Sequence, residues 1–334
     1  MTITQHRDVV SDDQPELTAR RESAADKIFL GLSGTAASLI LVTLAAVATF
    51  LLVEAWPALT DTAGALAERV QWIKPETGES LIEIIGFLVF GTVIISTIAL
   101  LIATPLSVGI ALFISHYAPR KLAAGLGYLI DLLAAIPSVV YGLWGAIVLI
   151  PVLQPFYQFL SEVLGWIPLF AAADDGTVSG TGRVAMSAGI VLAIMILPII
   201  TAVSREVFLQ TPVLHEEAAL AMGATRWEMI KMAVFPFGRS GVIGATMLGL
   251  GRALGETMAV YMILSPGLSY SFNILQAGEH NTIASFIALQ FPEANSSGVS
   301  ALIAMGLALF VITLLVNMAA RWVVSRRSEF SGAN

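Results

Sequence analysis

Long apolar runs separated by shorter polar segments dominate this sequence. Five of the runs carry no charged residue, and each is longer than the roughly 20 residues that a helix needs to cross a bilayer. A sixth run of similar length is interrupted by two charged residues, Arg252 and Glu256. Strand-like alternation is absent, so the runs predict helices rather than the strands of a barrel. The runs are 28–53, 84–115, 132–161, 184–204, 240–264 and 294–320.

This pattern predicts an all-α polytopic membrane protein with six transmembrane helices. We expect a transmembrane domain at 27–325 between two tails, 1–26 and 326–334. The first apolar run is too long for the apolar region of a signal peptide, which favours an uncleaved anchor. The expected spans are 28–54, 84–114, 123–152, 184–208, 238–264 and 299–322.

Composition supports a membrane protein and narrows the chemistry. Hydrophobic residues make up 57% of the chain and charged residues 12%, and the mean hydropathy is +0.83. The absence of cysteine excludes disulfides and thiolate metal ligands. We therefore expect membrane lipid as the surroundings, no metal site and no nucleic-acid partner.

The placement of Lys and Arg predicts the orientation, because cytoplasmic connections carry an excess of these residues. Both tails and the connection at 211–236 are rich in them, whereas the segment 265–298 has none. Both termini and the 211–236 segment are therefore predicted to be cytoplasmic. The residues on the predicted cytoplasmic side are Arg7, Arg20, Arg21, Lys27, Arg120, Lys121, Arg205, Arg226, Lys231, Arg239, Arg321, Arg326 and Arg327.

The 211–236 segment is an island of charge with signals for two short helices. Thr211 followed by Pro212 suits an N-cap and a first helical position. Gly223 suits a helix end that needs a left-handed residue. Thr225 and Glu228 have the spacing of a capping box for a second helix. The segment could be an ordinary polar loop, but two helices with a sharp bend would also make a knob that fits a groove on a partner.

Charged groups inside the predicted spans are pointers to function, because each costs about 2.5–3.5 kcal/mol at mid-membrane on insertion scales. Arg252 and Glu256 stand four residues apart, so one helical face would carry both and they could pair. Such a pair could be purely structural or could line a substrate path. Asp131, nearer the cytoplasmic end of the third span, suits a hydrogen bond between helices.

Proline within a span marks a kink or a broken helix. Pro137 is the best candidate for a break, because Ser138 and Tyr141 would add hydroxyl donors near the start of the second half-helix. A half-helix that starts inside the membrane can point its N-terminus at an anion. A tolerated kink is the alternative.

Two motifs resemble the permease subunits of ABC importers. Glu-Ala-Ala at 217–219, followed by Gly223 and Pro236, is similar to the EAA loop of bacterial importer permeases. The stretch 251–260, Gly-Arg-Ala-Leu-Gly-Glu-Thr-Met-Ala-Val, together with 136–145, resembles the phosphate-specific importers and their PstC-type subunit in particular. The similarity covers most of 80–325.

The resemblance implies a type I ABC importer permease fold and one half of a heterodimeric translocation pathway in the bacterial inner membrane. The implied partners are a second, PstA-type permease, two copies of a PstB-type cytoplasmic ATPase and an extracytoplasmic PstS-type binding protein that delivers inorganic phosphate. The implied substrate-pathway residues are Arg252, Glu256, Ser138 and Tyr141. The implied ATPase-coupling residues are Glu216, Glu217, Ala218, Ala219 and Gly223.

No lysine follows a glycine anywhere in the chain, so a Walker A loop is absent. ATP, the expected cofactor of such a system, would therefore be bound by the separate ATPase, and this chain would not be an enzyme. Gly31-Leu32-Ser33-Gly34 matches a motif of intramembrane serine proteases. However, the four histidines lie outside the spans or at their edges, so no base is positioned for Ser33.

Two other transport functions stay open. A permease for sulfate or molybdate would belong to the same class. A proton-coupled secondary transporter would use Arg252 and Glu256 as its coupling pair, but it would not need the 211–236 knob. Co-purification of an ATPase would distinguish an importer from a secondary transporter.

Overall fold

The computed structural model describes residues 24–61, 66, 68–70, 72–73, 80–172 and 178–328. Every regular element among these residues is a helix, as the apolar runs predicted. The chain divides into two units, residues 1–50 and 51–334, and the boundary falls inside α1 (Ala24–Thr60). The sites discussed below lie in the second unit.

Six helices among the described residues are long and apolar enough to cross a membrane, which confirms the predicted number. Two of them contain a π-helical turn that joins two α-helical parts, and a third ends in a π-helical turn. The six are α1; α3 (Leu81–Leu112) with η2 (Phe113–Tyr117); α5 (Ser138–Trp144), η3 (Gly145–Leu149) and α6 (Ile150–Leu164); α7 (Ala185–Leu209); α9 (Arg226–Met229), η5 (Ile230–Val234) and α10 (Phe235–Leu254); and α13 (Ser296–Ser328). The shorter helices are α4 (Arg120–Ala134), η4 (Pro168–Phe170), α8 (Val213–Ala221), α11 (Met258–Ile263), α12 (Ile283–Gln290) and η6 (Phe291–Glu293).

The third candidate span differs most from its predicted position. It runs over Ser138–Leu164 instead of 123–152, because the chain breaks before Pro137 and α4 is a separate helix that packs against α7. Proline disfavours helical conformation in the residue before it and has no N–H to continue the ladder. Of the two alternatives at Pro137, a break and a tolerated kink, the structure therefore shows the break. The apolar run 132–161 did not indicate where the span begins.

The segment 281–292 carries apolar residues at helical spacing, a pattern that a helix on the membrane surface would also show. It does form α12, and Thr282 is its N-cap, with the hydroxyl accepting the Ser285 N–H at 3.3 Å. However, Ile283 and Phe286 are buried in a core with α3 and α13. The hydroxyl of Thr92 on α3 accepts the Ile283 N–H at 3.0 Å, so α12 belongs to the helix bundle.

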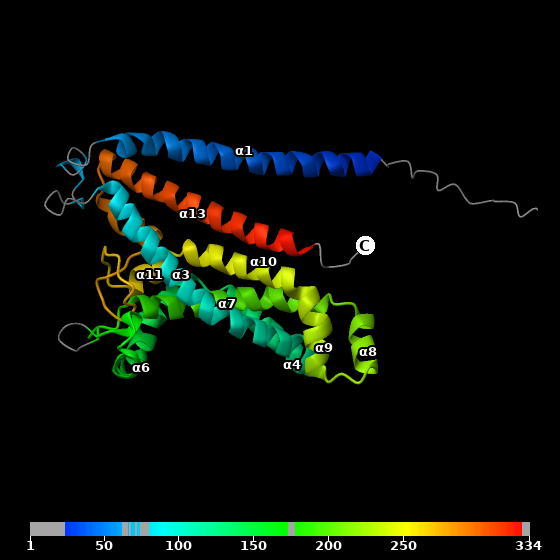
Figure 1. Ribbon diagram of the computed structural model, residues 1–334. Coiled ribbons are helices and arrows are strands. Elements are labelled where there is room, and N and C mark those ends of the chain that lie inside the picture. Colours follow the sequence, from blue (N-terminus) through cyan, green and yellow to red (C-terminus); the bar gives the residue numbers. More distant parts are fainter. Residues whose placement is uncertain are drawn as a thin grey trace, which may run out of the picture. The chain divides into compact units, whose positions relative to one another are not determined.

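Within the second unit, α3 and α7 pack along each other and α10 packs against both (Figure 1). Their shared core includes Ile95, Leu192 and Ala245, which have no exposed surface. Helices α8 and α9 lie at one end of this bundle, whereas α6, α11 and the irregular segment 264–282 lie at the other (Figure 1). The two ends therefore present different structures to their surroundings.

Small residues allow the closest approaches in this bundle. A side chain at Gly91 of α3 would overlap the carbonyl oxygen of Asn281, which lies just before α12. A side chain at Gly189 of α7 would likewise overlap the side chain of Ile98 of α3. One at Gly249 of α10 would overlap the side chain of Ile200 of α7. Close backbone approach of this kind is a common way to pack membrane helices.

We expect Gly91→Ala to destabilise the protein, because the obstructing atom belongs to the backbone of residue 281 and cannot rotate away. Gly109 of the same helix is the matched control, since an added Cβ there meets nothing within 4 Å. Gly109→Ala should be neutral or stabilising, because alanine gains about 1 kcal/mol over glycine in a helix interior. Thermal unfolding of the detergent-solubilised protein measures both variants, and equal unfolding temperatures would contradict the close approach.

Candidate functional site

The 211–236 segment folds as two short helices joined by a left-handed turn. Helix α8 ends at Ala221, and Gly223 has a φ of 86°, which glycine adopts without strain. The Ala224 N–H bonds the Ala219 carbonyl at 3.2 Å, and the Gly223 N–H bonds the Leu220 carbonyl at 2.9 Å. These two bonds make a Schellman motif, so the predicted role of Gly223 is confirmed.

The start of α9 confirms the predicted capping box. The Thr225 hydroxyl accepts the Glu228 N–H at 3.3 Å, and the Glu228 carboxylate accepts the Thr225 N–H at 2.7 Å. The predicted start of α8 is wrong by one residue: Pro212 is the N-cap and the helix begins at Val213. The Thr211 hydroxyl is buried and has no hydrogen-bond partner within the described part of the chain.

Helix α8 has a buried side and an exposed side. Ala219 is 3% exposed and packs in a core with Phe208 and Met229, whereas Glu217 and Ala218 are exposed. The exposed surface is also strongly apolar: Leu214 is 78% exposed and Met222 is 74% exposed. We call the exposed residues Val213, Leu214, Glu217, Ala218, Leu220 and Met222 the coupling surface. Exposed apolar side chains around charged ones are typical of a docking site for another protein.

Glu216 connects this segment to a transmembrane helix. Its carboxylate lies 3.4 Å from Nε2 of His116, which belongs to the π-helical turn at the end of α3. The Ser115 hydroxyl lies 2.7 Å from Nδ1 of the same histidine and fixes its ring. Sequence reasoning missed His116, because no pattern linked two residues one hundred positions apart.

The second candidate site lies where two helices are interrupted, between α4 and α5 and between α10 and α11. The Tyr141 hydroxyl donates to the Leu133 carbonyl at 2.9 Å and so bridges the first interruption. Gly142 lets α5 and α11 approach closely, since a Cβ there would lie 2.8 Å from the Cα of Ala259. Thus residues 138–144 and 256–263, which are distant in sequence, form one packed unit.

Arg252 and Glu256 do not form the expected ion pair. Helix α10 ends at Leu254, so the two residues do not share one helical face. Glu256 is 8% exposed and its Oε1 accepts the Ala259 N–H at 3.2 Å, which places its carboxylate at the start of α11. Arg252 is exposed and makes no ion pair with any described carboxylate, and its guanidinium acts electrostatically on Tyr141. The pairing model failed because it assumed an unbroken helix.

This second site therefore brings together three of the four predicted pathway residues in one region: Tyr141, Arg252 and Glu256. Ser138 lies at the start of α5 and is half-buried, with no side-chain hydrogen bond to a described residue. The guanidinium of Arg252, which has no described carboxylate partner, suits an anion rather than a cation. Within the described residues there is no group of three His, Cys, Asp or Glu side chains that could hold a metal.

Comparison with known proteins supports this description. Residues 103–329 match the family "binding-protein-dependent transport system inner membrane component". The chain is 45% identical over 315 residues to "Phosphate transport system permease protein PstC 2" of Mycobacterium tuberculosis, which covers 92% of this chain and 95% of the relative. It is 40% identical over 313 residues to the PstC protein of Xylella fastidiosa, covering 93% and 94% of the two chains.

A solved structure shows the same fold at lower similarity. The inward-facing methionine ABC transporter MetNI aligns with a TM-score of 0.50 and 15% identity over 71% of this chain and 93% of the other. At this identity the likeness concerns the fold alone, and it identifies the helix arrangement as that of a type I ABC permease. The chain belongs to the family of binding-protein-dependent transport system inner membrane components, among relatives named as PstC permease proteins.

Proposed function

We propose that this chain is the PstC-type permease subunit of an ATP-driven phosphate importer and forms one half of its translocation pathway. The observation that carries the proposal is the coupling surface, an exposed knob fixed to three membrane helices in a chain whose relatives are named phosphate permeases. The partners would be a PstA-type permease, two PstB-type ATPase subunits and a PstS-type phosphate-binding protein. Both termini and the coupling surface would face the cytoplasm.

The mechanism follows from how the coupling surface is attached. When the ATPase dimer closes on ATP, it would push α8, and Ala219, Met229 and Phe208 would transmit the movement into the bundle because they share one core. The Glu216–His116 contact would pull the end of α3 in the same direction. The Schellman turn at Gly223 would keep α8 and α9 at a fixed angle, so that the knob moves as one piece.

In the pathway, Arg252 would compensate the charge of phosphate inside a medium of low dielectric constant. A guanidinium binds two oxygens of a tetrahedral anion at once, which a lysine ammonium cannot do with the same geometry. Because Glu256 accepts the Ala259 N–H, it leaves Arg252 available to the anion. The Glu256 carboxylate would also favour an anion that carries its own O–H, as phosphate does near neutral pH, over sulfate.

Topology provides the first test of this proposal. A reporter that is active only in the cytoplasm should be active when fused after residue 222 and inactive when fused after residue 285. The reason is the excess of Lys and Arg on alternate connections. An active reporter at 285 together with an inactive one at 222 would reverse the orientation and remove the basis for ATPase docking.

Substitution in the coupling segment provides the second test. We expect Gly223→Val to abolish phosphate uptake while the protein stays in the membrane, because a β-branched residue does not adopt a φ of 86°. Gly223→Asn is the matched control and should retain uptake, since asparagine tolerates the left-handed region. Glu217→Lys should weaken co-purification with the ATPase. Uptake by Gly223→Val equal to that of Gly223→Asn would show that the segment is only a connector.

Arg252 provides the third test. Arg252→Gln should lower radiolabelled phosphate uptake by about 10- to 100-fold, the range that corresponds to one hydrogen bond to a charged group. Arg252→Lys should retain part of the activity. Glu256→Gln keeps an oxygen that can accept the Ala259 N–H, so it should assemble normally and isolate the effect of the charge. Uptake is measured in cells that lack other phosphate transporters, with membrane levels of the complex checked in parallel.

Normal uptake by Arg252→Gln at normal membrane levels would contradict a pathway through this residue. Uptake of sulfate or molybdate in place of phosphate by the wild-type complex would identify a permease for another oxyanion.

A further inference from the structure

A cavity lies away from Arg252, at the opposite end of α11. Its volume is about 260 Å³, and its polar lining comes from Arg183, Tyr261, Asn281 and Ser285. The apolar lining comes from α11, α12 and the start of the 264–282 segment. Since water occupies about 30 Å³ per molecule, this volume holds a tetrahedral oxyanion with several waters of its hydration shell.

Among the described residues that line this cavity, Arg183 alone is charged. Its Nη2 donates to the Met262 carbonyl at 3.0 Å and its Nε donates to the Ile263 carbonyl at 3.4 Å. These bonds anchor the guanidinium at the C-terminal end of α11 and use two of its five N–H groups. No described carboxylate pairs with Arg183, so three of its five donors remain for a ligand.

Asn281 supplies a second, buried donor. It is 3% exposed, and its Oδ1 accepts both the Thr282 N–H at 2.9 Å and the Ser285 hydroxyl at 2.6 Å. These two bonds fix the orientation of the amide, so Nδ2 is the atom that remains. Nδ2 donates to no described residue, and Asn281 lines the cavity, so this donor is available to a ligand there.

Tyr261 completes the polar lining with a hydroxyl that has no protein partner among the described residues. The available groups are therefore donors, and no carboxylate occurs among the described residues that line the cavity. A donor set with one guanidinium and no carboxylate fits an oxyanion and repels a cation.

We propose that Arg183, Asn281 and Tyr261 form a second oxyanion site, at the mouth of the pathway opposite the coupling surface. This proposal rests on the proposed function, in which that mouth faces the extracytoplasmic binding protein and the oxyanion is phosphate. Helix α11 has six residues, so its two ends are about 9 Å apart. The Arg183 site would hold phosphate after release from the binding protein and before the anion reaches Arg252.

The absence of a carboxylate has a consequence for selectivity. Without a carboxylate, the Arg183 site has no group to repel an oxyanion that lacks an O–H, so it should accept sulfate as well as phosphate. Selection between the two anions would then occur elsewhere, at Glu256 or in the binding protein.

The test uses chemical modification of arginine in the assembled, nucleotide-free complex. Phenylglyoxal reacts with accessible guanidinium groups, and mass spectrometry of peptides gives the modification rate at each arginine. Inorganic phosphate should slow modification of Arg183 by a factor of 1 + [L]/Kd, which is about tenfold at ten times the Kd. Sulfate should protect similarly, and chloride at equal ionic strength should not.

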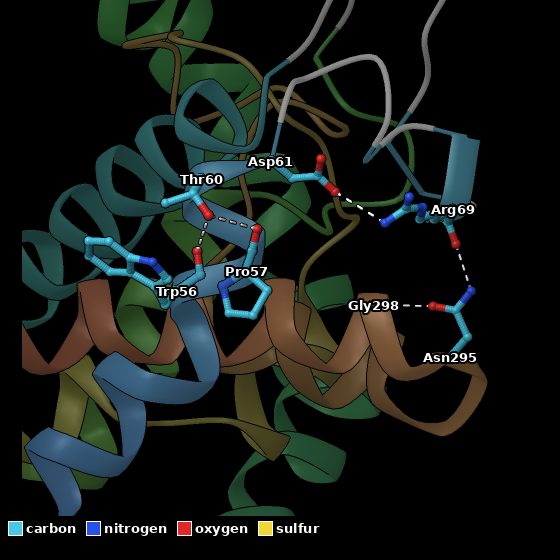
Figure 2. Close-up of polar contacts among 7 residues, drawn as sticks. All are labelled: Trp56, Pro57, Thr60, Asp61, Arg69, Asn295 and Gly298. Carbon is cyan, nitrogen blue, oxygen red and sulfur yellow. Dashed lines mark hydrogen bonds and ion pairs between the residues drawn. The ribbon is translucent and has the colours of Figure 1, made fainter.

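Arg69 is an internal control in the same sample. It lies at the same end of the second unit, where it meets Asp61 at 3.4 Å and its carbonyl accepts the Asn295 side chain at 2.6 Å (Figure 2). Asp61 already supplies its counter-charge, so phosphate should not protect it. Equal protection of Arg69 and Arg183, or no protection of either, would overturn the proposal.

Asn281→Asp separates binding from folding. The substitution keeps an oxygen that can accept the Thr282 and Ser285 bonds, but it replaces the Nδ2 donor with negative charge. Protection of Arg183 by phosphate should therefore be lost while the complex still assembles. Retained protection in the assembled Asn281→Asp complex would show that the cavity is not the binding site.

The outcome is separable from that of the proposed function. In an Arg252→Gln complex, phosphate should still protect Arg183, although uptake is lower by about 10- to 100-fold. Protection of Arg183 in a wild-type complex that imports no phosphate would retain the oxyanion site and reject the proposed function. Phosphate uptake without any protection of Arg183 would retain the function and reject the site.

Discussion

A helix that is interrupted inside a membrane protein leaves backbone N–H and carbonyl groups without partners, and the bilayer offers no water to replace them. In this protein, side chains satisfy these groups at α5 and α11. The Tyr141 hydroxyl bonds the Leu133 carbonyl, Glu256 accepts the Ala259 N–H, and Arg183 donates to the carbonyls of Met262 and Ile263. The residues that fit a substrate path are thus also those that allow the helices to break.

This double role explains why the helix interruptions and the polar residues occur together. A charged or hydroxyl side chain inside the membrane is costly unless it has a partner, and an unpaired backbone group is costly for the same reason. The polar side chain and the unpaired backbone group satisfy each other by forming a hydrogen bond. Close packing of Gly142 against Ala259 then fixes α5 on α11, so that the site is held by backbone contact rather than by flexible side chains alone.

The coupling surface and the interrupted helices connect through shared helices. Phe208 of α7 and Val242 of α10 pack with Met229 beneath the coupling surface, while Ile196 and Ala245 of the same two helices belong to the main core. A movement of α8, as proposed for coupling, would therefore be transmitted along α7 and α10, because close-packed interiors do not absorb strain by compression. Helix α10 ends at Leu254, with Arg252 in its last turn and Gly255 as its C-cap, where the second interruption begins.

Local signals in the sequence predicted those features that depend on a few neighbouring residues. The capping box at Thr225, the left-handed turn at Gly223 and the break at Pro137 each follow from the chemistry of one or two side chains. The number of spans follows from the lengths of the apolar runs. The start of the third span could not be predicted, since 132–161 is apolar on both sides of the break.

Features that depend on distant contacts were missed or wrongly predicted. The Arg252–Glu256 pair required a continuous helix, but Gly255 follows the end of α10 and Glu256 caps the next helix. Hydrophobicity alone does not distinguish an amphipathic helix on a membrane from one buried in a core, and α12 proved to be the latter. Asn281 acquires its position from Gly91, 190 residues earlier, and no local pattern encodes that approach.

The two proposed anion sites share one helix, which has consequences for conduction. Glu256 places negative charge at the start of α11 and Arg183 places positive charge at its end, so both complement the helix dipole. The charge of Arg183 is therefore partly balanced by the carbonyls it bonds, which weakens its hold on an anion. A transported anion must bind strongly enough to enter and weakly enough to leave. A moderately weak site at Arg183, followed by a fully available guanidinium at Arg252, would let the free energy of the anion fall as it moves from the mouth into the pathway.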